Sequence, residues 1–303
     1  MRGNETLDIA RFLEYLQHER RCSCRTVESY GDDLRAFQAF CKEKDESIVW
    51  ANVDADLIRD WMESMMDKGN NATSINRRLS ALRSFFRFAL KKKLVGKSPA
   101  HGVQGPKKQK PLPQFLKEKD VESLLDAKVS STSYKDVRAK TVLALFYETG
   151  MRLSELTGLD DEAVDIKNRQ LKVTGKRNKQ RIIPFGDKLA EMLGAYIKVR
   201  DEEVVRRTAG LFLTEKGCRM NPGQVRYEVR NLLSRVSTLK KKSPHVLRHT
   251  FATVVLNHGA GIESVQKLLG HESLATTEIY THTTFEQLRS VYKHTHPRNK
   301  KKQ

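Results

Sequence analysis

The chain has 303 residues, a length typical of about two domains that each bury a core of their own. Lys and Arg outnumber Asp and Glu by 56 to 37, and the net charge of +19 predicts a partner with dense negative charge. With 38% hydrophobic residues the chain is not disordered throughout, and no stretch approaches the ~20 apolar residues that span a bilayer. We therefore expect a cytoplasmic protein whose four cysteines are reduced and hold no zinc.

Four amphipathic helices are predicted in the first hundred residues, because apolar residues recur three and four positions apart over 9–16, 27–41, 57–65 and 75–86. Acidic residues outnumber basic ones up to residue 60, whereas basic residues dominate from 61 to 103. A solvated charged face would explain such a run in general, but here almost no acids balance the bases. We predict a helical domain over residues 1–103 whose fourth helix contacts phosphates through Arg77, Arg78, Arg83 and Arg87.

Residues 104–114 are predicted to be a linker between domains, because three prolines and a glycine prevent a helix. Its lysines, Lys107, Lys108 and Lys110, have no acidic residue within the segment. We therefore expect them to lie along a negatively charged partner.

A second, mixed α/β domain is predicted over residues 115–292. Helical periodicity there surrounds three short runs rich in β-branched residues, at 164–166, 170–174 and 181–184, which predict a small antiparallel meander. The expected fold is thus mainly α-helical with a small antiparallel β-meander in the second domain. Residues 293–303 contain several basic residues and no acids, which predicts a mobile basic tail.

One candidate for chemistry follows a glycine turn in the second domain. Arg152 comes two residues after Gly150 and opens a helix whose apolar side carries Leu153 and Leu156. A guanidinium beside a helix N-terminus favours an anion between them, although an arginine at such a position is often an ordinary surface residue.

A second group lies on one predicted helix, where His245, Arg248 and His249 are three or four residues apart and share a face. A metal site is disfavoured there, because Arg248 would repel a cation and no carboxylate lies between the two histidines. An anion site fits this set better. Further on, His271 follows a glycine and Tyr280 lies in a segment without other aromatic residues, where a tyrosine alone is usually half-buried core.

These residues occur together and in order, and the set resembles the tyrosine recombinase (phage integrase) family, with the Xer-type recombinases as the nearest likeness in length and layout. The resemblance covers the whole chain and rests on Arg152, Lys176 in the turn at 175–179, the spacing of His245 and Arg248, His271, and Tyr280. It implies an N-terminal core-binding domain that clamps DNA, the linker, and a catalytic domain that ends in the nucleophile.

The resemblance also implies a role for each residue. Two arginines, Arg152 and Arg248, would hold the non-bridging oxygens of a DNA phosphodiester, for which their planar groups are well matched. Tyr280 would attack the phosphorus and form a 3′-phosphotyrosyl link. His245 would act as a base or hydrogen-bond partner, His271 as a further donor to the phosphate, Lys176 as the general acid and Glu155 as a supporting acid near the site. No metal ion, ATP or other cofactor is then expected.

The implied partners are a double-stranded DNA recombination site and other subunits. The family acts as a tetramer through a Holliday junction, and here the segment around 285–294 would dock on a neighbouring subunit. A homo-tetramer, a hetero-tetramer with a paralogous recombinase, and assistance from a DNA translocase all stay open, as do chromosome-dimer resolution and mobile-element integration or excision. The target DNA sequence, and which arginines contact bases, are not determined by the sequence.

The sequence also bears on three other functions. A type IB topoisomerase uses similar chemistry but is disfavoured by the four-helix N-terminal module, and an inactive DNA-binding accessory protein is disfavoured because every family position is filled. A metal-dependent nuclease or transposase would need paired magnesium ligands, for which the sequence offers only Asp160, Asp161, Glu162 and Asp165. We interpret those acids as the polar lead into the first strand.

Overall fold

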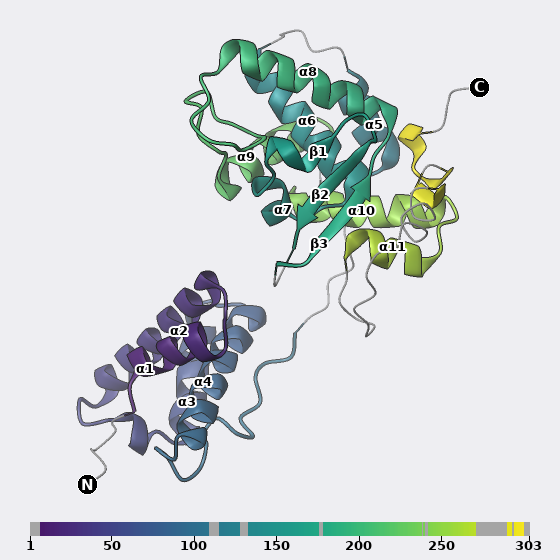
Figure 1. Cartoon of the computed structure of the whole chain (residues 1–303). Coiled ribbons are helices and arrows are strands. Elements are labelled where there is room, and N and C mark those ends of the chain that lie inside the picture. The colour runs from purple at the N-terminus through teal and green to yellow at the C-terminus, as the bar shows by residue number, and fades with distance from the viewer. Residues whose placement is uncertain are drawn as a thin grey trace. The chain divides into compact units, whose positions relative to one another are not determined.

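The structure is a computed structural model that describes residues 7–108, 115–127, 133–175, 178–237, 239, 242–270, 290–292 and 294–299. The chain folds into two compact units, Met1–Pro111 and Leu112–Gln303, each described here by itself (Figure 1). Within the described residues, no helix is both long enough and apolar enough to cross a membrane.

The N-terminal unit is helical, as predicted. Its helices are α1 (Ile9–Glu14), which continues as a π-helical turn over Tyr15–Glu19, α2 (Cys24–Lys44), α3 (Ala55–Asp67) and α4 (Ala72–Lys91). A polar side chain caps the start of each of the last three by accepting a hydrogen bond from a backbone amide, and these caps are Ser23, Asp54 and Asn71.

The core of this unit consists of the residues that the helical periodicity selects. Fully or nearly fully buried are Phe12, Leu34, Phe37, Ile58, Trp61, Ile75, Leu79, Leu82 and Phe86. The core reaches the end of the predicted domain, where Val103 is buried. The start of the predicted linker is held to α4, because Asn76 Nδ2 donates to the Pro106 carbonyl at 2.8 Å.

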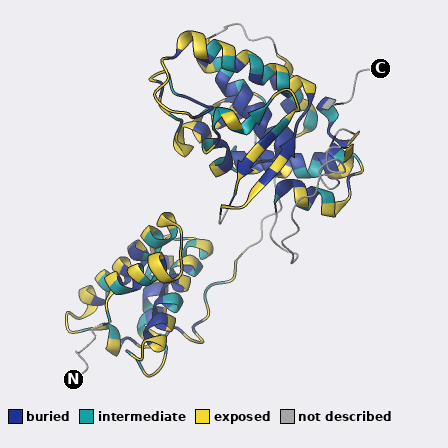
Figure 2. Cartoon of the chain, in the orientation of Figure 1, coloured by how far each residue is buried: buried dark blue, intermediate teal, exposed yellow. Residues whose placement is uncertain are grey.

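The second unit is built around one buried helix. Helix α6 (Tyr134–Thr149) is buried along most of its length and packs against α8 (Asp187–Glu203), α9 (Pro222–Ser234) and α10 (Pro244–Asn257) (Figure 2). The remaining helices are α5 (Glu118–Asp126), α7 (Leu153–Thr157) and α11 (Ile262–Leu269), and α11 packs against α10.

The predicted meander is confirmed as an antiparallel sheet with strand order β1 (Val164–Asp165), β2 (Gln170–Thr174) and β3 (Gln180–Pro184). Side chains alternate between its faces, so Leu171 and Val173 of β2 are buried. Arg181 lies opposite Val173 and is buried on the covered face, whereas the neighbouring Ile182 is 40% exposed.

The expectation of a mobile basic tail differs from the structure over residues 294–299. His296 is fully buried, its ring stacks on Phe251 of α10 and on Tyr292, and Arg298 donates to the buried Glu148 of α6 at 2.9 Å. Residues 294–299 are therefore held by ring contacts and by the buried carboxylate of Glu148, and the basic composition of the segment does not predict these partners. Lys293 and residues 300–303 lie outside the described residues.

Candidate active site

Three arginines from different elements meet at the end of α11. Arg181 Nε donates to the Leu268 carbonyl at 3.2 Å, Arg248 Nη2 to Leu269 at 2.7 Å, and Arg152 Nη2 to Gly270 at 2.8 Å. The last carbonyls of a helix lack intrahelical partners and carry partial negative charge, so each guanidinium satisfies one of them.

The glycine turn before Arg152 is what places two of these arginines side by side. Gly150 ends α6 with a φ of 58°, and a Cβ there would lie 2.5 Å from Cδ1 of Phe251. The Gly150 carbonyl accepts a hydrogen bond from Arg248 Nη1 at 2.7 Å, and the chain then turns so that Arg152 is the N-cap of α7. Only a glycine allows this close approach of α10 to the turn.

Glu155 joins Arg152 to Arg181. Its carboxylate accepts from Arg181 Nη1 at 2.6 Å and Nη2 at 2.9 Å, and from Arg152 Nη1 at 3.0 Å, while its side chain is only 1% exposed. Burial alone would raise the pKa of Glu155, but the bonds and charges of Arg181 and Arg152 outweigh it and hold that pKa below its usual value. The expected supporting acid therefore contacts Arg152 directly.

Arg181 is a site residue that the sequence did not single out. It lies in a run that reads as a strand, and strand periodicity alone favours an apolar residue at an inward position. Strand alternation is the signal that could have identified Arg181. Leu171 and Val173 lie on the covered face of the sheet, and the register places Arg181, not Ile182, on that same face.

The cluster carries excess positive charge. Within the described residues, Glu155 is the one carboxylate that accepts hydrogen bonds from this cluster of three arginines, and its donors are Arg152 and Arg181. Burial, together with the charges of Arg152 and Arg181, lowers the pKa of Arg248 to about 10, although Glu155 opposes the effect. The side chain of Arg152 is 40% exposed and those of Arg181 and Glu155 are covered, so an anion from solvent would meet Arg152 first.

His245 and His249 lie on the solvent side of α10, one turn apart. Their Nε2 atoms are 3.2 Å apart and their ring centroids 4.5 Å. Burial, with smaller effects from His249 and Arg248, lowers the pKa of His245, so its ring is neutral at neutral pH.

Three predicted catalytic residues, Lys176, His271 and Tyr280, lie outside the described residues. The residues that precede two of them are described. A Cβ on Gly175 would lie 3.5 Å from Oε1 of Glu155, and Gly270 is the residue whose carbonyl Arg152 binds. The chain thus reaches the arginine cluster immediately before Lys176 and immediately before His271.

The four arginines of α4 that are predicted to contact phosphates differ in their partners within the N-terminal unit. Arg77 and Arg78 form ion pairs with the buried Asp33 of α2, and Arg83 donates to the Val103 carbonyl, so these three side chains hold the N-terminal unit together. Arg87 is exposed and forms no ion pair within the described residues.

The linker lysines fall on both sides of the described boundary. Lys107 and Lys108 are exposed, and Lys110 lies outside the described residues. The exposed pair stays available for a negatively charged partner, as predicted from the composition.

The acidic run before β1 is committed to ion pairs. Asp160 pairs with Arg219, and Asp161 pairs with Arg200 at 2.7 Å and with Arg206 at 2.7 Å. These carboxylates therefore stabilise the fold around β1 and α8.

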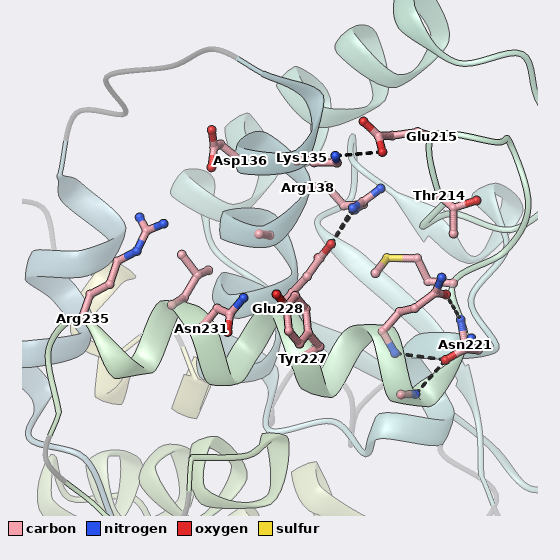
Figure 3. Close-up of a pocket in the computed structure, with 15 residues that line it drawn as sticks. Lys135, Asp136, Arg138, Thr214, Glu215, Asn221, Tyr227, Glu228, Asn231 and Arg235 are labelled. Atoms are coloured by element: carbon pink, nitrogen blue, oxygen red, sulfur yellow. Dashed lines mark hydrogen bonds and ion pairs between the residues drawn. The ribbon is translucent and has the colours of Figure 1, made fainter.

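A hollow of about 740 Å³ lies elsewhere in the second unit, between the start of α6, the length of α9 and the residues near Thr214 (Figure 3). The ion pair of Arg138 with Glu228 crosses it, and the exposed ring of Tyr227 lies at its side. It shares no residue with the arginine cluster, so we place the candidate site at the cluster.

Comparison with known proteins shows the family of the chain. The phage integrase family matches residues 114–287, and the phage integrase N-terminal SAM-like domain matches residues 9–93. The chain therefore belongs to the phage integrase family of tyrosine recombinases, which act in site-specific DNA recombination.

Its relatives include the tyrosine recombinase XerC of Chlorobaculum tepidum, 38% identical over 96% of this chain and 94% of that protein. XerC of Pelotomaculum thermopropionicum is 37% identical over 96% of this chain and 98% of that protein. Among solved structures, the XerH site-specific recombinase bound to palindromic difH substrate shares the fold, with a TM-score of 0.69 at 21% identity over 94% of this chain and 84% of that chain.

Proposed function

We propose that the arginine cluster binds the scissile phosphate of a DNA recombination site. The observation that carries this proposal is the excess positive charge at the end of α11, where the single carboxylate of Glu155 neutralises only one of three guanidinium charges. A phosphodiester brings the missing negative charge. Charge that builds on its non-bridging oxygens during attack would be met by donors already held in place by the carbonyls of Gly150, Leu269 and Gly270.

The reaction is a transesterification by Tyr280. Its hydroxyl oxygen bonds to the phosphorus while the bond from phosphorus to the 5′ oxygen breaks, and the hydroxyl proton passes to a base or water near His245. The 5′ oxygen takes a proton from Lys176 and leaves as a hydroxyl. The 3′-phosphotyrosyl link keeps the phosphodiester's free energy, so attack by the 5′ hydroxyl of a partner strand rejoins DNA without ATP.

Assembly on DNA completes the proposal. Exchange of strands between two duplexes requires four subunits, either copies of this chain or pairs with a paralogous recombinase, and a Holliday junction between the two rounds of exchange. The XerC relatives support a Xer-type recombinase. Its two candidate roles are chromosome-dimer resolution, with a DNA translocase as a further partner, and integration or excision of a mobile element.

The test is covalent capture on nicked duplexes that span candidate recombination sites, incubated with the protein in EDTA and separated on a denaturing protein gel. We expect a slower band with the wild type and no band with Tyr280→Phe, while both bind the duplex equally. Tyr227→Phe is the matched control, because this exposed tyrosine of α9 lies outside the cluster and its loss leaves the band unchanged. Capture that persists in Tyr280→Phe would overturn the assignment of the nucleophile.

A further inference from the structure

The mechanism above assigns no role to His249, although the structure places it against His245. The two residues lie one turn apart on α10, and their rings meet through the Nε2 atoms at 3.2 Å with an interplanar angle of 67°. Both side chains are exposed, so neither is needed to fill the core.

Two imidazole nitrogens at this distance must share one proton. A neutral imidazole has one N–H and one bare nitrogen, and two N–H groups or two lone pairs facing each other would repel. The contact is therefore a hydrogen bond in which one ring donates and the other accepts. It sets complementary tautomers on the two histidines and restrains the orientation of both rings.

The charges around the pair come from identifiable groups. His245 is affected mainly by burial and then by His249 and Arg248 of its own helix. Charged residues on the neighbouring elements, Arg152 of α7 and Arg181 of β3, act on Arg248 rather than on His245. Each neutral ring carries one proton, so protonation of both rings would place two like charges in contact beside Arg248.

We propose that His249 is a positioning residue for His245, because the hydrogen bond between the two rings fixes the orientation and the tautomer of His245. The proposal deepens the proposed function, on which it rests for the catalytic use of His245. The arriving DNA or tyrosine hydroxyl would then meet a ring that is already neutral and oriented. An exposed histidine without this contact would not affect the orientation of the His245 ring.

The test begins with the free protein and needs no DNA. The titration of His245 is followed by NMR in the wild type and in His249→Gln, which keeps a polar side chain but cannot carry a proton. We expect His245 to titrate at a higher pH in the variant, because the charge of His249, which lowers the pKa of His245, is then absent. His258→Gln is the matched control: this histidine ends the same helix, where its Nδ1 contacts the Val254 carbonyl, and its loss leaves the titration of His245 unchanged.

Covalent capture then gives a second readout. The acid limb of the pH–rate profile should move to higher pH in His249→Gln, with rates several-fold below wild type near pH 6 and a smaller loss near pH 8, where the ring is neutral but no longer oriented. An acid limb that stays in place, or an unchanged His245 titration, would overturn the positioning role. Because the titration is measured without DNA, it tests the contact between His249 and His245 even if the recombinase assignment proves wrong.

Discussion

At the scale of single residues, the site depends on Glu155 and Arg181. Arg152 is half exposed and could adopt many rotamers, but its guanidinium is bound on one side by Glu155 and on the other by the Gly270 carbonyl. Glu155 is in turn held by two bonds from Arg181. A buried strand arginine thereby restrains the rotamer of an exposed one, which is what binding a phosphate in one geometry requires.

Removal of Arg181 should therefore cost both stability and activity. In Arg181→Met the buried carboxylate of Glu155 loses two of its donors, and breaking a buried ion pair typically costs about 3–5 kcal/mol, here reduced because Arg152 remains. Replacing both partners, in Arg181→Met with Glu155→Met, should restore most of the free energy of unfolding but not DNA cleavage.

Urea unfolding and covalent capture measure these two effects. Arg169→Met is the control, since its pair with Asp187 at 2.6 Å is exposed and worth less than about 1 kcal/mol. A double variant as unstable as the single one would contradict the buried-charge explanation.

At the scale of elements, the turn between α6 and α7 couples three helices. Gly150 ends α6, its carbonyl binds Arg248 of α10, and the space where a side chain would project is filled by Phe251 of α10 and Leu269 of α11. The C-terminal segment packs on the same region, since Tyr292 belongs to the cluster formed by Phe251 and Leu269. The positions of Arg152 and Arg248 are thus set by helix packing around one glycine.

Substitution of Gly150 tests that coupling. Gly150→Ala forces a Cβ into Phe251 at a positive φ, so we expect a loss of well over 1 kcal/mol in stability and a fall in cleavage larger than the fall in folded fraction. Gly194→Ala, inside α8 with no atom within 4 Å of the added Cβ, should instead raise stability by about 0.5–1 kcal/mol. Thermal melting and covalent capture distinguish the two, and equal stability of Gly150→Ala and wild type would disprove the packing argument.

At the scale of the whole molecule, the charge of +19 is divided between structural and available groups. Arg77, Arg78 and Arg83 are used inside the N-terminal unit, whereas Arg87 and the linker residues Lys107 and Lys108 are exposed. DNA affinity and its salt dependence should therefore follow the second group.

Neutralising Arg87 should weaken DNA binding without destabilising the protein. In Arg87→Gln one phosphate contact is lost, so the slope of log affinity against log salt concentration should fall by about 0.9. Arg83→Gln is the matched control: it removes the bond to the Val103 carbonyl and should lower the melting temperature of the N-terminal unit. Fluorescence anisotropy at several salt concentrations measures the slope, and an unchanged slope in Arg87→Gln would remove this residue from the interface.

The sequence by itself determined the helices, the meander and the family, because periodicity, turn residues and motif spacing are local properties of the chain. The apolar positions of the first four helices form the core of the N-terminal unit, and the predicted site residues Arg152 and Arg248 bind adjacent carbonyls at the end of α11. Only the tertiary structure decided which charges are structural. Arg181, Arg83 and Arg298 are bound by partners 26, 20 and 150 residues away in the chain, and no local pattern specifies such contacts.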